Sequence, residues 1–580
     1  MSEYWTNKNS FGVMPGRPFV TVGNVGAGAT YESSDQTAFN TAISAVASKG
    51  GEVYVLPGTL IKPTASLFIT GTNVRVVFGR GSLVQLQTGV RFNTPIVSGG
   101  TASWTQIVVV AGTSGAPAKN IDIVDMSIDS VDHNTALISG LVVGGNVYNL
   151  TTYRCQETNL GRYGMWVLGY AEVPLGTAYA GPFYNITTWN HVSDNIGESN
   201  GSDGAHTKVS YTQTSGTVGG VHLWDDYATN LYAIAVDLPV NNGNSAVIAR
   251  DFQVHGGHYE AQAANQPGIF LESQDGATGT GDAYDFVIEG CWVSGFTDNY
   301  AIDVTNHHVH ITDCTSFGAS SIGLTGSATL YASRASLAPQ DWYIENFVSR
   351  QDPTAIRFVS TGLLANFVME GISVRGGSSN DEGSTLNTVG ISVTAASTKT
   401  IKDLEVRDFN LANIAGGGTP VSIAAGTAPY LTNCAFRSCP GFGGQGYALA
   451  AGSEPIVVAQ TISKSETQAA DSNVLTFTPP HVAGKYRLEW SCDVSSASSG
   501  VIGFQMSYVD SNGSTVTNKA FTIFVAGTAA GGLTLTTSVA SNFTGGANIG
   551  VDASGTNVVI KWPGGGTTVA VVTAILVQTQ

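Results

Sequence analysis

Charged residues are scarce in this sequence: they make up 12% of the 580 residues, and the formal net charge is −17. An acidic chain without a lysine and arginine cluster lacks the basic stripe that phosphate backbones require, so we expect no nucleic-acid partner. No apolar run approaches the roughly 18–20 residues of a transmembrane helix, which argues against membrane insertion. The opening residues, MSEYWTNKNS, do not resemble a secretory signal, so we expect synthesis in the cytoplasm without a signal peptide.

Cysteine is also rare. Six cysteines are scattered along the chain, and only Cys434 and Cys439 are close together, at a spacing typical of neither a disulfide framework nor a zinc site. We therefore expect reduced, mostly buried thiols. The motifs HExxH, GxSxG and GxxxxGK[ST] and the dinucleotide fingerprint are absent. This disfavours metal hydrolases, serine hydrolases and nucleotide-driven enzymes, and we expect no metal site and no cofactor.

What the sequence has instead is glycine, at 71 residues, and valine, isoleucine and threonine that alternate with small polar residues, as in strands. One pattern recurs eleven times, 23 to 45 residues apart: an apolar residue, a spacer, a small or turn-forming residue and a second bulky residue. Its occurrences begin at Ile123, Leu150, Ile186, Leu231, Val254, Ile288, Ile311, Ile344, Met369, Val406 and Leu431.

A second pattern follows the first in most repeats: a small residue, an apolar one, a variable one and an apolar one. It begins at Gly164, Gly268, Ala301, Ser321, Ala355, Gly390 and Pro420. Two short strands per repeat, with spacers of unequal length, indicate coils whose strands stack in register while their turns vary. We predict an all-β fold: a right-handed parallel β-helix of about eleven coils.

The two ends of the chain differ from this repeat. Residues 1–20 form an irregular arm that could dock onto another protein, and the β-helix is expected over 21–440. Ser34 begins a helix in which Phe39, Ile43 and Val46 share one face, suited to capping the open apolar end of the first coil. A linker over 441–455 precedes eight or so strands at 456–580, which predict a jelly-roll-like β-sandwich.

The segment from Gly23 to Thr59 resembles the pectate-lyase-like superfamily, in the form found in bacteriophage tailspikes and capsule depolymerases. The shared features are a glycine-rich opening, the helix start Asp35-Gln36-Thr37-Ala38 and a finish with Gly50-Gly51 and Pro57-Gly58. The family usually has a second acidic residue before the helix, where this chain has Ser33-Ser34. The motif is specific for the fold and its cap and carries no catalytic residue.

This resemblance implies several properties of the whole protein. It implies a homotrimer in the virion, attached to other tail or baseplate proteins through the N-terminal arm. It implies a bacterial surface polysaccharide, capsule or O-antigen, as the binding partner. In such relatives the C-terminal sandwich either trimerises the fibre or holds sugars, and both roles stay open for residues 456–580.

Acids, histidines and aromatics concentrate between residues 189 and 303, where one spacing between repeats stretches to 45 residues. Flat aromatic rings suit the C–H faces of sugars, and carboxylates suit glycoside hydrolysis, which in most families needs two of them. We expect six side chains to contact substrate: Trp189, His206, His222, Trp224, Tyr259 and Phe270. For His222 we expect an outward position in the column of Phe270.

Aligning the second pattern of two consecutive coils predicts one acid pair. Phe270 and Asp303 then share an outward column, and Glu272 lies two residues further along its strand. Strands ~4.8 Å apart and ~6.6 Å for two residues place Glu272 about 8 Å from Asp303. That separation leaves room for a water molecule between them, as in an inverting hydrolase. In this interpretation Glu272 is the general acid and Asp303 the base.

Three other acids are alternatives. Asp225 and Asp226 are adjacent, so at most one can reach a common outer surface. Asp203 lies in a glycine-rich loop, where a turn role is the simpler interpretation.

Two other functions compete with hydrolysis. A polysaccharide lyase would need a base and a group that neutralises a uronate, often Ca²⁺ or arginine, and Arg154, Arg162 and Lys208 are the few basic residues near the aromatic region. A receptor-binding fibre would bind polysaccharide without cleaving it.

Overall fold

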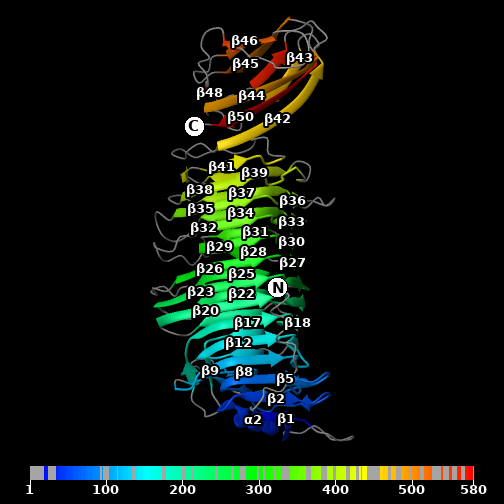
Figure 1. Ribbon diagram of the computed structural model, residues 1–580, viewed down its shortest axis with the longest axis vertical. Coiled ribbons are helices and arrows are strands. Elements are labelled where there is room, and N and C mark those ends of the chain that lie inside the picture. The colour runs from blue at the N-terminus through cyan, green and yellow to red at the C-terminus, as the bar shows by residue number, and fades with distance from the viewer. Residues whose placement is uncertain are drawn as a thin grey trace. The chain divides into compact units, whose positions relative to one another are not determined.

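Strands of two to twelve residues make up almost all of the regular secondary structure in the computed structural model, and in many of them buried and exposed side chains alternate (Figure 1). The structure describes residues 18–23, 34–91, 94–95, 103–113, 115–133, 137–172, 178–198, 204–211, 215–241, 246–262, 267–274, 282–296, 300–304, 307–318, 322–327, 340–360, 368–380, 388–395, 400–412, 414, 418–425, 430–432 and 434–440, and the strands between 457 and 578. Two units are distinguished, residues 1–343, 347–356 and 362–364, and the remainder.

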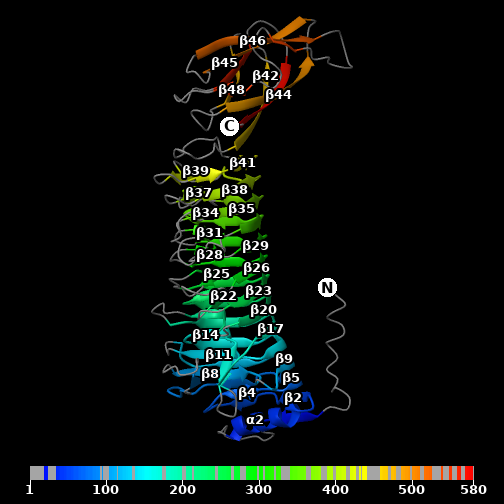
Figure 2. The same ribbon diagram turned by 90° about the vertical axis from the view of Figure 1, so that its left-hand side faces the viewer.

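The first unit is a stack of parallel turns, and each turn contributes one strand to each of three sheets (Figures 1 and 2). Sheet A contains β2 (Gly51–Val55), β5 (Thr72–Phe78), β9 (Ala118–Val124), β12 (Val147–Tyr153), β17 (Phe183–Trp189), β20 (Ser215–Trp224), β23 (Ala246–His255), β26 (Asp282–Glu289) and β29 (His307–Thr312). Sheet B contains β3 (Leu60–Ile61), β6 (Leu83–Gln85), β10 (Ser127–Asp129), β13 (Gln156–Leu160), β18 (Val192–Ile196), β21 (Tyr227–Leu231), β24 (His258–Ala261), β27 (Trp292–Ser294), β30 (Thr315–Phe317) and β33 (Val348–Arg350). Sheet C contains β4 (Leu67–Ile69), β8 (Ser103–Val110), β11 (Ile138–Val143), β14 (Tyr163–Val167), β19 (Ala205–Tyr211), β22 (Ile234–Asn241), β25 (Ile269–Gln274), β28 (Tyr300–Val304) and β31 (Ile322–Ser327).

The predicted all-β parallel β-helix is confirmed. The solenoid has about nine turns, so the count differs slightly from the eleven coils predicted. The predicted repeat at Leu231 is wrong: Leu231 ends β21 in sheet B, and Ile186 pairs with Val221 in sheet A. The apparent 45-residue spacing came from this misplacement, because the next turn begins ten residues earlier than the pattern suggested.

Each turn changes direction between sheets A and B through one residue in the left-handed conformation. In the first unit Asp125, Arg154, Asn190, Asp225 and Gly256 follow successive strands of sheet A, with φ between 51° and 66°. Glycine adopts this conformation freely, and Asn and Asp tolerate it better than other residues. This explains the turn-forming third residue in the copies of the predicted pattern at Ile123 and Val254. In the copies at Leu150 and Ile186 the left-handed residue is the fifth, because those copies begin two residues earlier in the strand.

A second column of left-handed residues stands at the start of sheet A strands. Asn73, Asn120, Asn149 and Asn185 have φ between 54° and 60°. Each later side chain donates a hydrogen bond from Nδ2 to the Oδ1 of the one before it, over 2.8 to 2.9 Å. Asparagines at the same position in consecutive turns thus satisfy each other's side-chain hydrogen bonds and fix the spacing of the turns.

The interior is filled by columns of apolar side chains that stack in register. One column in sheet A is 0–1% exposed throughout. It consists of Val74, Ile121, Leu150, Ile186, Val221, Phe252, Phe286 and Val309. Burying each such side chain stabilises the fold by roughly 1.5–3 kcal/mol, so the stack supplies its own core. Five cysteines are free and buried, as predicted, and burial raises the pKa of Cys155 to about 12.

Helix α2 (Ser34–Ala47) packs against β1 (Phe19–Val22), β2, β4 and β5, at the N-terminal end of the stack (Figure 2). Phe39, Ile43 and Val46 are buried, as the amphipathic pattern predicted. The carbonyl oxygen of the Gln36 side chain accepts hydrogen bonds from the backbone N–H groups of Thr64 and Ala65, which ties the helix to the first turn. Among the described residues no helix has the length and apolar character needed to cross a bilayer.

The second unit contains parallel strands and, further along the chain, antiparallel ones. Parallel pairs join β35 (Val368–Arg375) to β38 (Thr400–Arg407) and β37 (Val389–Ala395) to β39 (Thr419–Ala425). The antiparallel strands are β42 (Val457–Thr467), β43 (Ser472–Phe477), β44 (Lys485–Ser496), β45 (Gly500–Val509), β46 (Thr515–Val525), β47 (Thr537–Val539), β48 (Asn548–Gly550), β49 (Val558–Trp562) and β50 (Val569–Gln578). They pair in two groups, one with β42, β44, β48 and β50 and one with the remaining five. The linker 441–455 and most of the arm 1–20 lie outside the described residues.

The contact between helix and first turn leads to a prediction. Gly71 has φ 98°, and a Cβ there would lie 2.4 Å from the carbonyl oxygen of Ala47. Gly89 also has a positive φ, 80°, but a Cβ there meets nothing within 4 Å. We expect Gly71→Ala to lower the free energy of unfolding by about 1–3 kcal/mol more than Gly89→Ala, as measured by urea denaturation. Equal effects of the two substitutions would show that the close approach to the helix is not what requires Gly71.

Candidate functional site

The residues that the sequence singles out lie in three separate places of the first unit. Phe270 and Asp303 are on the outer face of sheet C, and Trp189, His222 and Trp224 are on the outer face of sheet A. His206, Asp226 and Tyr259 lie in the interior. Asp203 lies outside the described residues.

One outward column of sheet C carries most of the charge near the predicted acid pair. The register runs from Trp166 to Lys208, Asp237, Phe270 and Asp303 in five consecutive turns. The predicted alignment of Phe270 with Asp303 is therefore confirmed. Asp237 stands on the other side of Phe270, one turn earlier, so a carboxylate flanks the ring on each side.

The members of this column have distinct surroundings. Asp237 is 2% exposed and its carboxylate forms an ion pair with the ammonium group of Lys208. Asp303 is 8% exposed and its strand neighbour is the partly buried Phe270. The indole N–H of Trp166 donates a hydrogen bond to the hydroxyl of Ser210, over 2.8 Å, which fixes the far end of the column. Two acids with different neighbours are what general acid–base chemistry requires.

Sequence reasoning missed Asp237. It lies in β22, three residues after the misplaced repeat Leu231-Tyr-Ala-Ile234, so its turn was aligned wrongly with its neighbours. The correct signal is the alternation Ala235-Val236-Asp237-Leu238, which matches Ile269-Phe270-Leu271 of the next turn. Glu272 lies in β25, two residues beyond Phe270, and its side chain lies outside the described residues. Its role as the general acid stays a prediction.

The outer face of sheet A carries a stack of aromatic rings. Trp189 and Trp224 occupy the same position in consecutive turns, with ring centroids 5.0 Å apart, and Trp224 and His255 follow at 3.8 Å. The planes of neighbouring rings are 13° and 10° from parallel. The broad faces of these rings therefore cover one another, and the edges are turned outward. This geometry changes the expectation for Trp189 and Trp224, because a sugar would meet the ring edges rather than a free face.

The outward position expected for His222 is confirmed, but the column expected for it is wrong. His222 pairs with Thr187 and Gln253 in sheet A and is not in the sheet C column of Phe270. Its Nε2 lies 3.0 Å from Oδ1 of Asp251, a partly buried hydrogen-bond contact on the same face as Trp224.

Of the adjacent acids, Asp225 is exposed at the left-handed corner and Asp226 is 1% exposed in the interior, which fits the expectation that only one could face outward. His206 and Tyr259 are fully buried, so neither is available to a polysaccharide at the outer surface. Sequence alternation did not reveal this, because the corner residue interrupts the regular in–out order.

The interior polar residues form one connected network. The carboxylate of Asp226 accepts hydrogen bonds from the hydroxyl of Thr188 and from the backbone N–H of His191, and lies 3.7 Å from His206 Nε2. His191 Nε2 lies 3.1 Å from a carboxylate oxygen of Glu157. These residues are at most 1% exposed.

Glycine makes room for the carboxylate of this network. A Cβ on Gly164 would lie 2.4 Å from one carboxylate oxygen of Glu157, and a Cβ on Gly140 3.0 Å from the other. The backbone N–H of Leu141 donates to the same carboxylate over 3.2 Å. The buried acid thus requires the small residue at Gly164, which opens one copy of the second sequence pattern, and the carboxylate also lies close to Gly140 in the turn before.

Burial opposes a charge on His191, but the carboxylates of Glu157 and Asp226 outweigh it and raise the pKa of His191. The two carboxylates thus favour the charged form of the buried His191 side chain, which contacts Glu157 directly. Within the described residues, no three His, Cys, Asp or Glu side chains are arranged to hold a metal ion.

Comparison with known proteins gives matches among solved structures only. No protein-family model and no curated protein matches the chain. The Dettilon tailspike protein gp208 is 12% identical over 97% of this chain and 94% of that chain, with a TM-score of 0.39. The tailspike protein of E. coli bacteriophage HK620 in complex with pentasaccharide is 12% identical over 94% and 90%, with a TM-score of 0.41. The A-module of the Azotobacter vinelandii mannuronan C-5 epimerase AlgE6 is 15% identical over 69% and 94%, with a TM-score of 0.37.

The buried network predicts a pH-dependent stability. Because the folded-state pKa of His191 lies above its ordinary value of about 6.5, its charge stabilises the fold fully below that value. That contribution is lost as the pH rises through the folded-state pKa. We expect His191→Gln to cost about 3 kcal/mol of unfolding free energy near pH 6 and clearly less near pH 9.

Urea denaturation at both pH values measures this difference, and His310→Gln, at an exposed position on β29, is the control. A cost for His191→Gln that is the same at both pH values would contradict a charged His191.

Proposed function

We propose that the protein binds a bacterial surface polysaccharide and cleaves it by hydrolysis, as a tailspike depolymerase. The observation that carries this proposal is the outward column of sheet C, where Phe270 lies between Asp237 and Asp303. Phe270 is partly exposed and offers a sugar a stacking surface, and the carboxylates on either side of it, 2% and 8% exposed, are acid–base groups beside that surface.

Asp303 belongs to either possible catalytic pair. Two strand spacings of ~4.8 Å put Asp237 and Asp303 about 9.6 Å apart along the column. The diagonal from Glu272 to Asp303 is about 8 Å on the same reasoning. Both values are close to the roughly 6.5–9.5 Å that an inverting hydrolase needs to hold a water molecule between its carboxyl groups.

The surroundings suggest separate roles for Asp237 and Asp303. The ammonium group of Lys208 favours the ionised form of Asp237, which suits a base that activates water. Asp303 is nearly buried beside an aromatic ring, which suits an acid that protonates the leaving oxygen. This assignment reverses the base role first expected for Asp303, with Glu272 as its alternative partner.

The assembly follows from the resemblance of residues 23–59 to tailspike proteins. We propose a homotrimer located in the virion tail, with the N-terminal arm attached to other tail or baseplate proteins. The polysaccharide is the capsule or O-antigen of the host, and hydrolysis needs no cofactor.

The proposal predicts how three substitutions change cleavage. Asp303→Asn is expected to lower the cleavage rate at least about 100-fold, because it removes a member of either pair. A comparable loss in Asp237→Asn or in Glu272→Gln identifies the partner. Size-exclusion chromatography of capsule and lipopolysaccharide from a host panel, with an assay for new reducing ends, measures the rates.

Asp285→Asn is the matched control, since Asp285 is an exposed acid on sheet A with a positive φ that asparagine tolerates. Three outcomes would contradict hydrolysis at this column. In the first, the Asp303→Asn variant keeps its full activity. In the second, new ultraviolet absorbance accompanies cleavage, as the double bond left by a lyase would produce. In the third, the wild-type protein binds the polymer without shortening it.

A further inference from the structure

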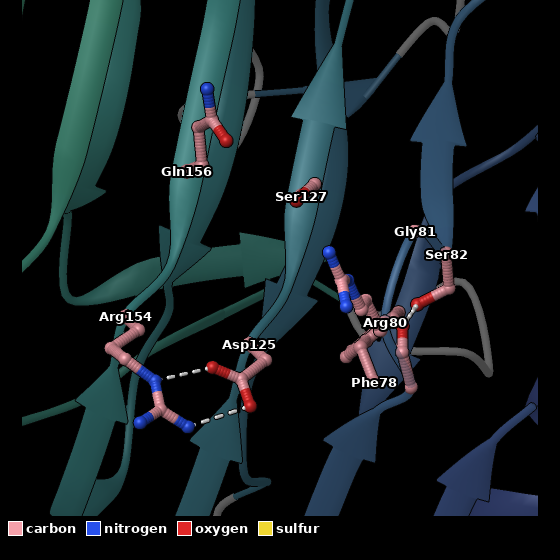
Figure 3. A pocket seen from close by; sticks show the side chains of 9 residues that line it. Phe78, Arg80, Gly81, Ser82, Asp125, Ser127, Arg154 and Gln156 are labelled. Atoms are coloured by element: carbon pink, nitrogen blue, oxygen red, sulfur yellow. Dashed lines mark hydrogen bonds and ion pairs between the residues drawn. The ribbon is translucent and has the colours of Figure 1, made fainter. Parts of the chain in front are cut away.

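A pocket lies at the corner between sheets A and B, in the turns of β5, β9 and β12 (Figure 3). None of the residues predicted to contact substrate lines it. It has a volume of about 320 Å³ and is open to solvent. Its lining includes Phe78, Arg80, Ser82, Asp125, Ser127, Arg154 and Gln156. We propose that this pocket binds the carboxylate of an acidic sugar residue.

Charge is the first argument. The whole chain has 25 basic residues and a net charge of −17, yet two arginines line this one pocket. The two guanidinium groups of Arg80 and Arg154 and the single carboxylate of Asp125 leave one positive charge. A positive pocket on an acidic protein attracts an anion that the rest of the surface repels.

Arg154 is held rigidly. Its Nε and an Nη donate to the two carboxylate oxygens of Asp125 over 2.6 and 2.8 Å, as Figure 3 shows. Its guanidinium also lies 4.4 Å from the ring centroid of Tyr153. The hydrogen bond to Asp125, more than burial, sets the pKa of Arg154, which is raised. Because both residues occupy the left-handed corner of consecutive turns, the backbone places them side by side.

Arg80 is the arginine of this pocket whose guanidinium group is available to bind a ligand. It stands between Gly79 and Gly81 in the tight turn after β5, and its side chain has no hydrogen-bond or ion-pair partner among the described residues. Its backbone carbonyl accepts a hydrogen bond from the N–H of Gly58, which anchors the turn while leaving the guanidinium available. An arginine so placed matches the fork of a carboxylate.

Uncharged polar groups complete the pocket. Ser127 on β10 and Gln156 on β13 line it and make no side-chain hydrogen bond within the described part of the chain. A hydroxyl and an amide suit the hydroxyl groups of a sugar ring, and the volume is that of a small-molecule site. The choice of a sugar acid over another carboxylate rests on the proposed function.

The position of the pocket also fits a polymer. Tyr153 pairs with Trp189, so the pocket lies at the start of the corner along which Trp189, Trp224 and His255 are stacked. A chain whose acidic residue is held at Arg80 could run along this corner, in contact with the outward ring edges. The site would be separate from the acids of sheet C.

Ligand-observed NMR titration of the full-length protein with methyl glucuronide and methyl glucoside tests the proposal, because the two sugars differ in the carboxylate. We expect the glucuronide to bind and the glucoside to bind at least about tenfold more weakly. Arg80→Gln is expected to weaken glucuronide binding about tenfold. Arg91→Gln, which removes an exposed arginine outside the pocket, should leave it unchanged.

The proposal is overturned if methyl glucuronide does not bind, if it binds the Arg80→Gln variant as tightly as wild type, or if inorganic phosphate displaces it at an equal or lower concentration. The last result would define a general anion site. Polysaccharide cleavage measured on the same samples separates this question from the proposed hydrolysis, since binding in the pocket does not require an active sheet C column.

Discussion

In-register stacking of parallel turns is the constraint on which the rest of this structure depends. Strands in one sheet can pair only if each turn changes direction at the same point as its neighbours, and a residue with positive φ performs this change after each strand of sheet A. Once the corners coincide, every other position is repeated in columns. The asparagine ladder, the aromatic stack and the acids of sheet C are three such columns. The proposed function therefore rests on a column, in which each turn contributes one side chain.

Much of the fold could be predicted because its signals are local. Alternation, a turn-forming third residue and a capping helix are visible in short stretches, and Phe39, Ile43 and Val46 are buried as their spacing predicts. Register is different, since it is a relation between turns. Leu231-Tyr-Ala-Ile234 satisfies the short pattern better than Val221-His-Leu-Trp224, whose third residue is a leucine, yet it is Val221 that pairs with Ile186.

The same difference divides the candidate site. Phe270 and Asp303 were aligned correctly, because both belong to clear copies of the second pattern. Asp237 was missed through the error at Leu231, and His222 was assigned to the wrong sheet for the same reason. The burial of His206 and Tyr259 had no signal in the sequence, and the adjacency of Asp225 and Asp226 indicated only that one of the two acids faces inward. Polar residues that point inward look like polar residues that point outward until the space left by Gly140 and Gly164 is known.

The buried network favours one register of the stacked turns over others. Most interior positions hold valine, isoleucine or phenylalanine, so one turn could be exchanged for the next with little loss of contact. Glu157, His191 and Asp226 come from three consecutive turns, and the two carboxylates favour the charged form of His191 only when those turns are adjacent. A nascent chain that skipped a turn would bury an uncompensated charge, which costs several kcal/mol. The histidine and its two acids thus identify three particular turns within a repetitive sequence. They disfavour misaligned stackings of the turns that apolar packing alone would accept.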